Sequence, residues 1–197
     1  KQTYTGKTKP LYFKEAKNRF KKWEDKISFF ECTVNSEMDH WTYEHYQRNF
    51  IRECLVELEC DDNDIVFISD IDEIVNISHI LSALPCSSFR IEMPFYYYFT
   101  NLRASEMWDF VVCCQWGDIK NIPIGDRLKY ASMFPVLFRD SENKNGGHFS
   151  YLFGYSVQKY KQKISSFSHS EFNNFYFKNR VRLKYCISKK SDIYERS

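Results

Sequence analysis

The stretch Asp64-Ile-Val-Phe-Ile-Ser-Asp70-Ile-Asp72-Glu73-Ile74 decides the fold of this chain. Its first half, Ile65 to Ile68, is an unbroken apolar run rich in β-branched residues. That pattern is typical of a strand buried on both faces in the middle of a parallel sheet. The run ends in three carboxylates. We therefore expect a central strand over Ile65–Ser69 with an acidic cluster at its carboxyl end.

The spacing of these carboxylates suggests a site. In an extended chain Asp70 and Asp72 point to the same side, and Glu73 points away from them. Carboxylate oxygens suit magnesium or manganese, which can in turn hold the phosphates of a ligand. Open α/β sheets bind ligands at this end of their strands. A solvated acidic turn is the alternative, and for an Asp-x-Asp motif alone the two interpretations carry equal weight.

Length and composition indicate a folded protein. The 197 residues predict a single domain, and a chain that is 43% hydrophobic and 18% aromatic is not disordered. A net charge of +2 gives no reason to expect nucleic acid as a partner. We expect no membrane-spanning segment within this chain, and we expect it to be truncated at its N-terminus because it begins at Lys1 without a signal or Met.

The cysteines favour a reducing compartment. They number seven, and none form a Cys-x-x-Cys pair, which argues against a zinc ribbon and a fully paired disulfide framework. We therefore expect most of them to be buried small hydrophobes in a cytoplasmic protein. An anchor upstream of Lys1 would instead place the domain in the Golgi lumen.

Hydrophobic periodicity predicts alternating helices and strands. Asp39 is expected to cap the long second helix, whose buried stripe would run from Tyr43 to Leu58. Strands dominate the second half of the chain, so the order of elements predicts a mixed α/β domain. We expect helices over 13–23, 40–59, 78–84, 155–163 and 171–188, and strands over 26–34, 65–69, 89–100, 108–116 and 148–153.

Six segments, taken in order, resemble one family. They are Thr3-Tyr-Thr-Gly6 with Lys9-Pro10-Leu11, Trp41-x-x-Glu44-x-x-Gln47-Arg48-Asn49, Ser69-Asp-Ile-Asp-Glu-Ile74, Gly146-Gly147-His148-Phe149-Ser150-Tyr151, Lys163-Ile-Ser-Ser-Phe-Ser-His169-Ser-Glu171 and Asp192-Ile-Tyr-Glu-Arg196. In this order they resemble glycosyltransferase family 17, the family of the β-1,4-mannosyl-glycoprotein N-acetylglucosaminyltransferase that adds bisecting N-acetylglucosamine.

The resemblance implies an inverting glycosyltransferase that moves a sugar from a UDP-sugar to a glycan acceptor. UDP-N-acetylglucosamine is the donor it favours. It also implies a GT-A-like nucleotide-sugar-binding fold with a mixed central sheet. The chain departs from the family twice. The family's usual first strand and helix are missing before Thr3, and Gly147 directly precedes His148 where the family often has a tryptophan.

Donor and metal ligands follow from the matching segments. A divalent ion, manganese or magnesium, would offset the charge on the departing diphosphate. Asp72 is the first choice as its ligand, Asp70 would bind the ion through water or hold the ribose, and His169 would complete the shell. Thr3, Lys9 and Arg48 would face the nucleotide, with Arg48 as a fork donor to the diphosphate. The alternative for Arg48 is a surface ion pair with Glu44. The alternative for His169 is a structural hydrogen bond at the start of a helix.

An inverting transfer also needs a base and an acceptor surface. Glu171 is the first candidate base and Asp126 the second, although either could be a helix cap or an ion-pair partner instead. Tyr97, Trp108 and His148 are the candidate acceptor contacts, since sugars stack on aromatic faces. Each of these three could equally be a core or structural residue.

Two other functions compete with the transferase. A haloacid-dehalogenase-type phosphatase also places Asp-x-Asp after an apolar strand, but its motif continues with Thr or Val where this chain has Glu73-Ile74. A degenerate, non-catalytic carbohydrate-binding module is the third interpretation, and the missing first strand is its motivation. Such a module would bind carbohydrate without any affinity for a nucleotide.

Overall fold

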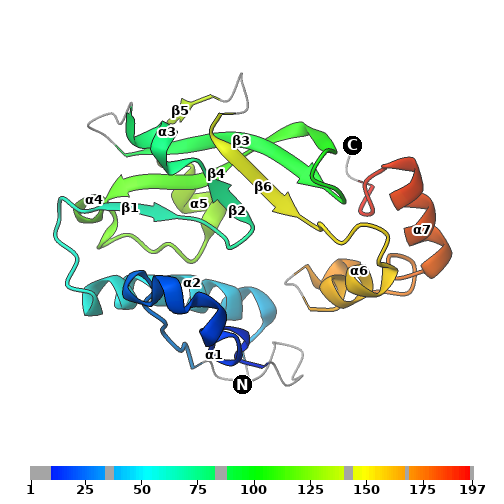
Figure 1. Cartoon of the computed structure of the whole chain (residues 1–197), viewed down its shortest axis with the longest axis horizontal. Coiled ribbons are helices and arrows are strands. Elements are labelled where there is room, and N and C mark those ends of the chain that lie inside the picture. The colour runs from blue at the N-terminus through cyan, green and yellow to red at the C-terminus, as the bar shows by residue number, and fades with distance from the viewer. Residues whose placement is uncertain (1–9, 34–37, 83–87, 140–143, 167–168, 196–197) are drawn as a thin grey trace.

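A mixed β-sheet forms the centre of the molecule (Figure 1). The computed structural model describes residues 10–33, 38–82, 88–139, 144–166 and 169–195. Within them the strand order is β1-β4-β3-β6-β2, and β5 also pairs with β3. The strands β3, β5 and β6 run parallel, whereas β1 and β3 are antiparallel to β4 and β2 is antiparallel to β6. Their bounds are β1 Ile65–Ile68, β2 Glu73–Val75, β3 Phe89–Tyr97, β4 Arg103–Gln115, β5 Val136–Phe138 and β6 Gly146–Ser150.

The apolar run Ile65–Ile68 forms strand β1, but the prediction that it is a central strand is wrong. In the described part of the chain it pairs only with β4, in antiparallel register from Ile65 opposite Gln115 to Ile68 opposite Val112. Ile65 is 40% exposed, and only Ile68 is buried. Strands β3 and β4 hold the central places instead, because both are longer and both are flanked on two sides.

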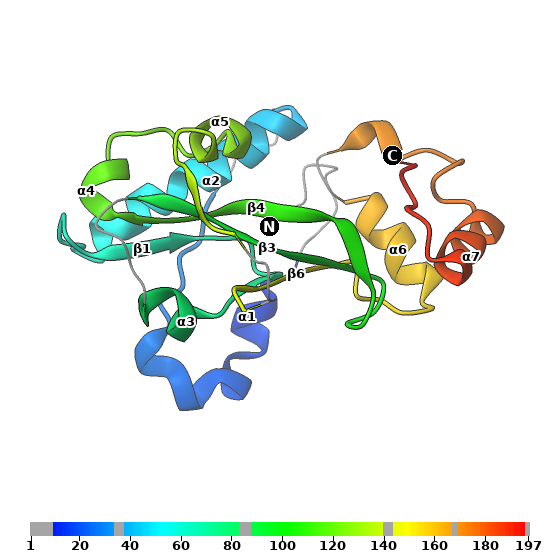
Figure 2. The ribbon, with the colours of Figure 1, turned by 90° about the horizontal axis from the view of Figure 1, so that it is seen from above.

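Helices lie on both faces of this sheet (Figure 2). The helices α2, α4 and α5 lie on one face, α3 and the α1–η1 segment lie on the other, and α6 and α7 stand beyond one end of the strands. None of the described helices is both long and apolar enough to cross a bilayer. The helices are α1 Tyr12–Glu15, η1 Lys17–Lys26, α2 His40–Glu57, α3 Ile77–Ser82, α4 Trp116–Ile119, α5 Arg127–Ala131, α6 Val157–Ile164, η2 Ser170–Phe172 and α7 Arg180–Lys189.

Three apolar clusters of described residues make up the core. One lies on each face of the sheet, and the third lies where α6 and α7 meet the end of the strands. Val112 and Cys114 of β4 face α4 and α5, whereas their neighbours Val111 and Cys113 face α3. This alternation is the period-two pattern of a strand covered on both sides. The third cluster joins the end of β3 to α6 and α7 and is rich in tyrosine. The six described cysteines are free, and Cys113, Cys114 and Cys186 are buried.

The N-terminal elements differ from the expected ones. Instead of one helix over 13–23, α1 ends at Glu15 and a 3₁₀ segment follows, with non-helical backbone at Trp23. Neither element has a buried residue, so little packing holds a regular α-helix there. The strand expected over 26–34 is also wrong for its described residues, because Lys26 ends η1 and residues 27–33 form no strand.

The C-terminal helix is shorter than predicted. The expected span 171–188 contains η2, a turn-rich loop and then α7, which begins only at Arg180. Asn179 supplies the break, because its side chain accepts hydrogen bonds from the backbone N–H groups of Val181 and Arg182. The other expected helices and strands are confirmed within a few residues, although β4 begins five residues before 108.

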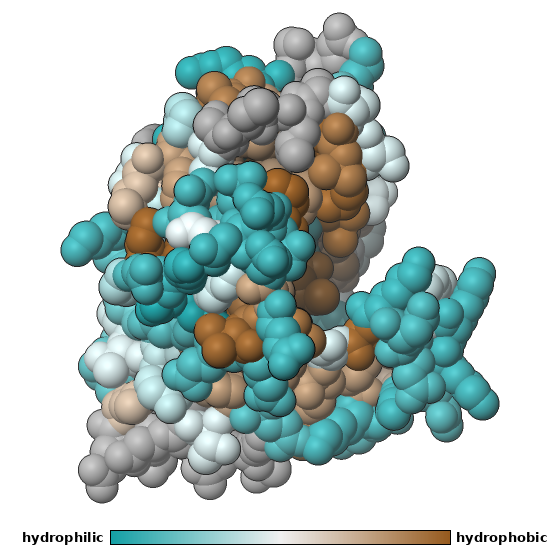
Figure 3. Space-filling view, turned by 90° about the vertical axis from the view of Figure 1, so that its left-hand side faces the viewer, coloured by the Kyte–Doolittle hydropathy of each residue, from teal (hydrophilic) through white to brown (hydrophobic). Residues whose placement is uncertain are grey.

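Hydrophobic atoms form separate patches among hydrophilic ones on the face shown in Figure 3. Exposed aromatic side chains include Trp23 (47% exposed) and Phe29 (40% exposed) of the N-terminal segment. Phe29 stacks on Phe13 at 5.2 Å between ring centroids, and Phe13 contacts Phe20 at 5.3 Å. Phe13, Phe20 and Phe29 therefore pack on one another.

Candidate active site

A cavity of about 770 Å³ collects most of the predicted site residues. The N-terminal half of α2, the turn after β1, the start of α5, strand β6 and the segment around η2 all contribute to its wall. Segments more than a hundred residues apart in the sequence therefore meet at one place. The predicted residues that line it are Arg48, Asp70, Asp72, Trp108, Asp126, His148, His169 and Glu171.

Asp70 is held by two arginines. Arg48 donates from Nη1 to Oδ1 at 3.0 Å and from Nη2 to Oδ2 at 3.2 Å, which is a bidentate fork. Arg127 donates from Nη1 to Oδ2 at 2.6 Å. Burial opposes ionisation of Asp70, but the positive charges of Arg127 and Arg48 outweigh it and hold its pKa below the usual value. Arg48 also makes the predicted pair with Glu44, at 3.2 Å.

Glu73 and Arg127 form a buried ion pair that sequence reasoning missed. Nη2 of Arg127 donates to both carboxylate oxygens of Glu73 at 2.6 Å, and the indole Nε1 of Trp108 donates to Oε1 at 2.6 Å. The Glu73 side chain is fully buried and that of Arg127 is 11% exposed. Burial raises the pKa of Glu73, and the hydrogen bonds from Arg127 offset only part of that effect.

The expectation that Glu73 points away from the site is wrong, because the chain turns at this point. The backbone N–H of Glu73 donates to the carbonyl of Asp70 at 3.0 Å, and the Glu73 carboxylate accepts from the backbone N–H of Asp70 at 2.7 Å. In a turn the period-two rule of extended strands no longer applies. Asp70 and Glu73 consequently share the guanidinium of Arg127.

Asp72 is less constrained than Asp70. Lys163 Nζ lies 3.9 Å from its Oδ2 and His148 Nε2 lies 3.7 Å from its Oδ1, both beyond hydrogen-bonding distance. Its side chain is 28% exposed, and its backbone carbonyl accepts from Phe149 N at 2.7 Å. Of the Asp-x-Asp pair, Asp72 is therefore the carboxylate with lone pairs open to a ligand.

His148 lies between two aromatic rings. It stacks on Phe95 with 4.8 Å between ring centroids and contacts Trp108 at 4.1 Å. Its Nδ1 is buried and has no hydrogen-bond partner among the described residues. Burial lowers its pKa to about 4, although the charge of Asp72 acts in the opposite direction. His148 is accordingly a neutral imidazole at pH 7.

The pairing of β6 with β2, which requires a glycine at position 146, brings His148 beside the acidic turn. Strand β6 pairs with β2, so that His148 lies opposite Glu73 and Gly147 opposite Ile74. Gly146 has φ of +118°, and a Cβ there would lie 2.0 Å from the carbonyl oxygen of Ile74. A residue with a side chain could therefore not occupy this position without moving β2 away.

His169 and Glu171 form a pair at another part of the cavity wall. Nδ1 of His169 lies 2.6 Å from Oε1 of Glu171, and its ring meets Trp41 of α2 edge-on at 5.0 Å. Partial burial disfavours the charged carboxylate, but the hydrogen bond from His169 keeps the pKa of Glu171 below its usual value. Glu171 is therefore ionised, and able to accept a proton, at neutral pH.

The remaining predicted residues have other surroundings. Asp126 caps α5 by accepting from Lys129 N at 3.1 Å, which confirms the capping alternative, and it also lines the cavity. Tyr97 is buried in the core outside the cavity wall, and its hydroxyl donates to Asp192 at 3.3 Å. Thr3 and Lys9 lie outside the described residues.

The residues present can hold a metal ion only in part. In the described ranges no group of three or more His, Cys, Asp or Glu side chains is arranged to bind one. Magnesium in nucleotide enzymes is usually bound by one or two carboxylates together with substrate phosphates, and does not need a complete protein cage. Asp72 provides one such carboxylate, whereas both oxygens of Asp70 already accept from arginines. The described residues therefore suit a metal ion that binds together with a phosphorylated ligand.

The fold and this cavity are consistent with an α/β glycosyltransferase. The model of glycosyltransferase family 17 matches residues 1–196, so the chain belongs to that family. The resemblance of the six sequence segments is thereby confirmed, and the protein is a transferase whose class uses a sugar donor and a glycan acceptor. No curated protein and no solved structure matches the chain.

Proposed function

We propose that this domain transfers a sugar from a UDP-sugar to a glycan acceptor, with inversion and with the help of a divalent ion. N-acetylglucosamine is the donor sugar that the resemblance favours. The haloacid-dehalogenase interpretation loses its basis, because that chemistry needs a carboxylate free to attack phosphorus and Asp70 is held by two arginines. Membership in family 17 likewise gives no support to a phosphatase.

The charge of the cavity wall carries the proposal of a metal ion. Among the described residues that line it, five carboxylates face three Lys or Arg side chains, an excess of two carboxylates. A nucleoside diphosphate is also an anion and would be repelled by such a wall. A divalent cation bound with the diphosphate removes this conflict, and Asp72 would hold it. Bound there, the ion would act as a Lewis acid toward the leaving phosphate.

The other polar residues then have distinct roles. Arg48 and Arg127 fix Asp70 through three hydrogen bonds, so that this carboxylate is pre-oriented toward a ribose hydroxyl or a water. His148 and Trp108 present an aromatic wall to the acceptor sugar. The imidazole of His148 stays neutral in this environment. It therefore adds no charge next to Asp72.

We assign the base to Glu171. Its Oε1 accepts from His169, which leaves Oε2 to accept the proton of the acceptor hydroxyl. The same contact favours the tautomer of His169 with hydrogen on Nδ1, and Nε2 is then the ring nitrogen that would coordinate the ion. Metal-binding histidines commonly donate their other N–H to a carboxylate in this way.

A donor screen tests the proposal. UDP release would be measured from a panel of UDP-sugars with manganese, with magnesium and with chelator, in the presence of a glycan acceptor. We expect turnover with UDP-N-acetylglucosamine and metal, and none with chelator. Absence of UDP release from every sugar, together with absence of UDP binding in calorimetry, would favour the non-catalytic carbohydrate-binding module.

Two variants test the roles of the His169–Glu171 pair. Glu171→Gln is expected to lower turnover by roughly 10²-fold or more while UDP still binds, because a base acts only as the bond forms. His169→Ala should instead weaken the metal-dependent binding of UDP. If Glu171→Gln turns over at the wild-type rate, the assignment is wrong and Asp126 is the next residue to change.

A further inference from the structure

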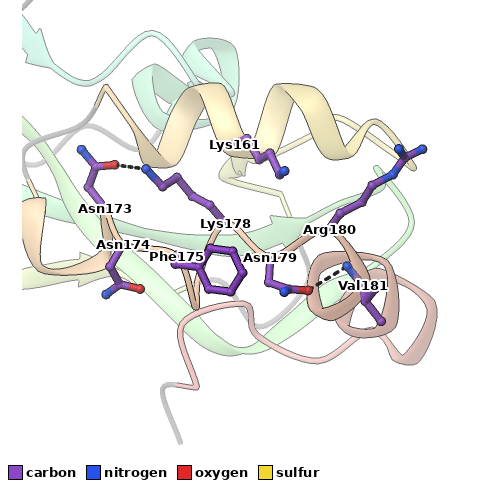
Figure 4. A pocket seen from close by; sticks show the side chains of 8 residues that line it. All are labelled: Lys161, Asn173, Asn174, Phe175, Lys178, Asn179, Arg180 and Val181. Atoms are coloured by element: carbon purple, nitrogen blue, oxygen red, sulfur yellow. Dashed lines mark hydrogen bonds between the residues drawn. The ribbon is translucent and has the colours of Figure 1, made fainter.

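A second pocket (Figure 4), of about 570 Å³, shares no described lining residue with the catalytic cavity. Its lining comes from α6, from the loop after η2 and from the first turn of α7. Among the described residues that line it, three are cations and none is acidic, so its charge is opposite to that of the catalytic cavity. The residues are Lys161, Asn173, Asn174, Phe175, Lys178, Asn179, Arg180 and Val181.

The loop that forms this pocket is held in a defined shape. The side chain of Asn174 donates to the carbonyl of Glu171 at 3.0 Å and accepts from the backbone N–H of Phe177 at 3.3 Å. Lys178 Nζ donates to Oδ1 of Asn173 at 2.7 Å, a contact drawn in Figure 4. These bonds present the ring of Phe175, which is 84% exposed, at the pocket rather than in the core.

The lining selects a class of ligand. An exposed aromatic ring offers a face on which the C–H groups of a sugar can stack, as aromatic side chains do at many wet interfaces. The cations Lys161, Lys178 and Arg180 can donate charge-assisted hydrogen bonds to a carboxylate, sulfate or phosphate. One ligand that satisfies both kinds of contact is a sugar ring bearing an anionic group.

The position of the pocket relates it to the acceptor. Glu171 and Phe172 line the catalytic cavity, and the next residues, Asn173 to Phe175, line the second pocket. The segment around η2 therefore contributes to both walls. Lys161 and Lys163 are two residues apart on α6 and therefore face opposite sides of that helix, so α6 stands between the pocket and the cavity.

We propose that this pocket is a distal acceptor subsite that binds an acidic sugar residue of the glycan whose other end enters the catalytic cavity. The proposal rests on the glycosyltransferase function proposed above and names a class of acceptor for it. Phe175 would stack on the ring of the acidic sugar, and Lys161, Lys178 and Arg180 would neutralise its charge. The negatively charged catalytic cavity would accept only the neutral end of such a chain.

Calorimetry with two matched oligosaccharides tests this subsite. The probes are a hyaluronan hexasaccharide, in which glucuronate alternates with N-acetylglucosamine, and the neutral hexamer of N-acetylglucosamine. The wild-type protein should bind the acidic hexamer at least about ten-fold more tightly, and added salt should reduce the difference, because the contacts are between charges. Equal affinity for the two probes would overturn the proposal.

Three variants locate the binding. Lys161→Gln combined with Arg180→Gln should lose the preference for the acidic hexamer, and Phe175→Ala should weaken binding of that hexamer at all salt concentrations. Lys184→Gln and Lys189→Gln together remove two charges from α7 outside the pocket and are the matched control. If this control loses as much affinity as the pocket variant, general attraction and not a subsite explains the binding, and the proposal fails.

UDP release with the neutral hexamer as acceptor separates this inference from the proposed function. Wild-type protein and the Lys161→Gln/Arg180→Gln variant should release UDP at similar rates with that acceptor, because both pocket residues lie outside the catalytic cavity. Normal turnover without any preference for the acidic probe would overturn the subsite alone. Loss of turnover in the wild-type protein would overturn the transferase proposal, whatever the probes show.

Discussion

The two aspartates of the Asp-x-Asp motif have different surroundings. Asp70 accepts three hydrogen bonds from guanidinium groups, whereas among the described residues the neighbours of the Asp72 carboxylate are the neutral His148 at 3.7 Å and Lys163 at 3.9 Å. The first carboxylate therefore contributes to stability through its partners, and the second is available to a ligand. Changing each to asparagine keeps its shape but removes its charge, so the pair forms a matched comparison.

We expect Asp70→Asn to destabilise the protein and Asp72→Asn to leave its stability almost unchanged. Loss of a charged acceptor from Arg48 and Arg127 should cost about 1.5–3 kcal/mol, the range for hydrogen bonds to charged groups. Asp72→Asn should nevertheless abolish metal-dependent turnover, since asparagine lacks the charge that the ion needs. Denaturant unfolding and UDP-release assays measure the two effects. Full activity of Asp72→Asn, or of the wild type in excess chelator, would contradict the role of Asp72.

His148 gives the protein a specific acid sensitivity. Its pKa is about 4 in the folded protein, below the ordinary value of 6.5, so the unfolded chain binds the proton more tightly. The contribution of neutral His148 to the free energy of unfolding is complete above pH 6.5 and is lost as the pH falls toward 4. Between pH 7 and pH 5 the loss should be roughly 1–2 kcal/mol.

Denaturant unfolding at pH 7 and pH 5, in chelator, checks this expectation. His148→Phe is the control, because a phenyl ring can keep the contacts with Phe95 and Trp108 but cannot titrate. The free energy of unfolding should fall less in the variant than in the wild type over this interval. The same fall in both proteins would place the acid sensitivity at other groups.

At the level of elements, helix α2 depends on its cap. It has no buried residue, so packing contributes less to it than is usual for a helix of 18 residues. Asp39 accepts from the backbone N–H groups of Trp41 and Thr42 at 3.0 and 3.2 Å and from the Thr42 hydroxyl at 2.5 Å. The cap also fixes where the helix starts, and therefore where Arg48 lies.

Asp39→Ala should lower the free energy of unfolding by about 1 kcal/mol. For a chain of this size that corresponds to a fall of about 2–4 °C in Tm. Asp39→Asn is the control, because its side-chain oxygen can still accept both backbone hydrogen bonds. Thermal unfolding followed by circular dichroism measures the difference. An alanine variant as stable as the asparagine one would show that the cap is dispensable.

At the level of the whole molecule, the buried pair of Glu73 and Arg127 joins the acidic turn to α5 on the other side of the cavity. Arg127→Met leaves a fully buried carboxylate beside Trp108 without its cation, which should cost about 3–5 kcal/mol at pH 7. Adding Glu73→Gln removes that stranded charge. The double variant should therefore recover part of the loss, as measured by urea unfolding.

The pH dependence of Arg127→Met provides a second check. Burial already raises the pKa of Glu73, and without Arg127 it should rise further. An acid whose folded pKa is raised binds its proton more tightly in the folded protein, so stability is highest below the ordinary pKa and is lost as the pH rises through the folded value. The deficit of the variant should thus be smaller at pH 5 than at pH 8. A deficit independent of pH would contradict this account.

Local signals in the sequence determined several elements of the fold and the family of this protein. The apolar run before Asp70 and the cap at Asp39 each depend on neighbouring residues, and both are present in the structure. The buried stripe predicted for α2 from Tyr43 to Leu58 is wrong, because the helix has no buried residue and Tyr46 and Leu58 are 41% and 47% exposed. The six family segments, matched in order, also gave the family that the match to residues 1–196 confirms. These features needed no knowledge of which segments meet in space.

Only the tertiary structure decided the position of β1 and the partners of the acidic turn. Ile65–Ile68 reads as a buried central strand, but which strands flank it depends on long-range pairing, and β3 and β4 take the centre. Arg127 lies 57 residues from Asp70 along the chain. In the sequence, only its position next to Gly125 and Asp126 suggested that it belongs to the site. The turn at Asp70–Glu73 then aims two carboxylates at that one guanidinium, because charges far apart in sequence pair only once the fold has brought them together.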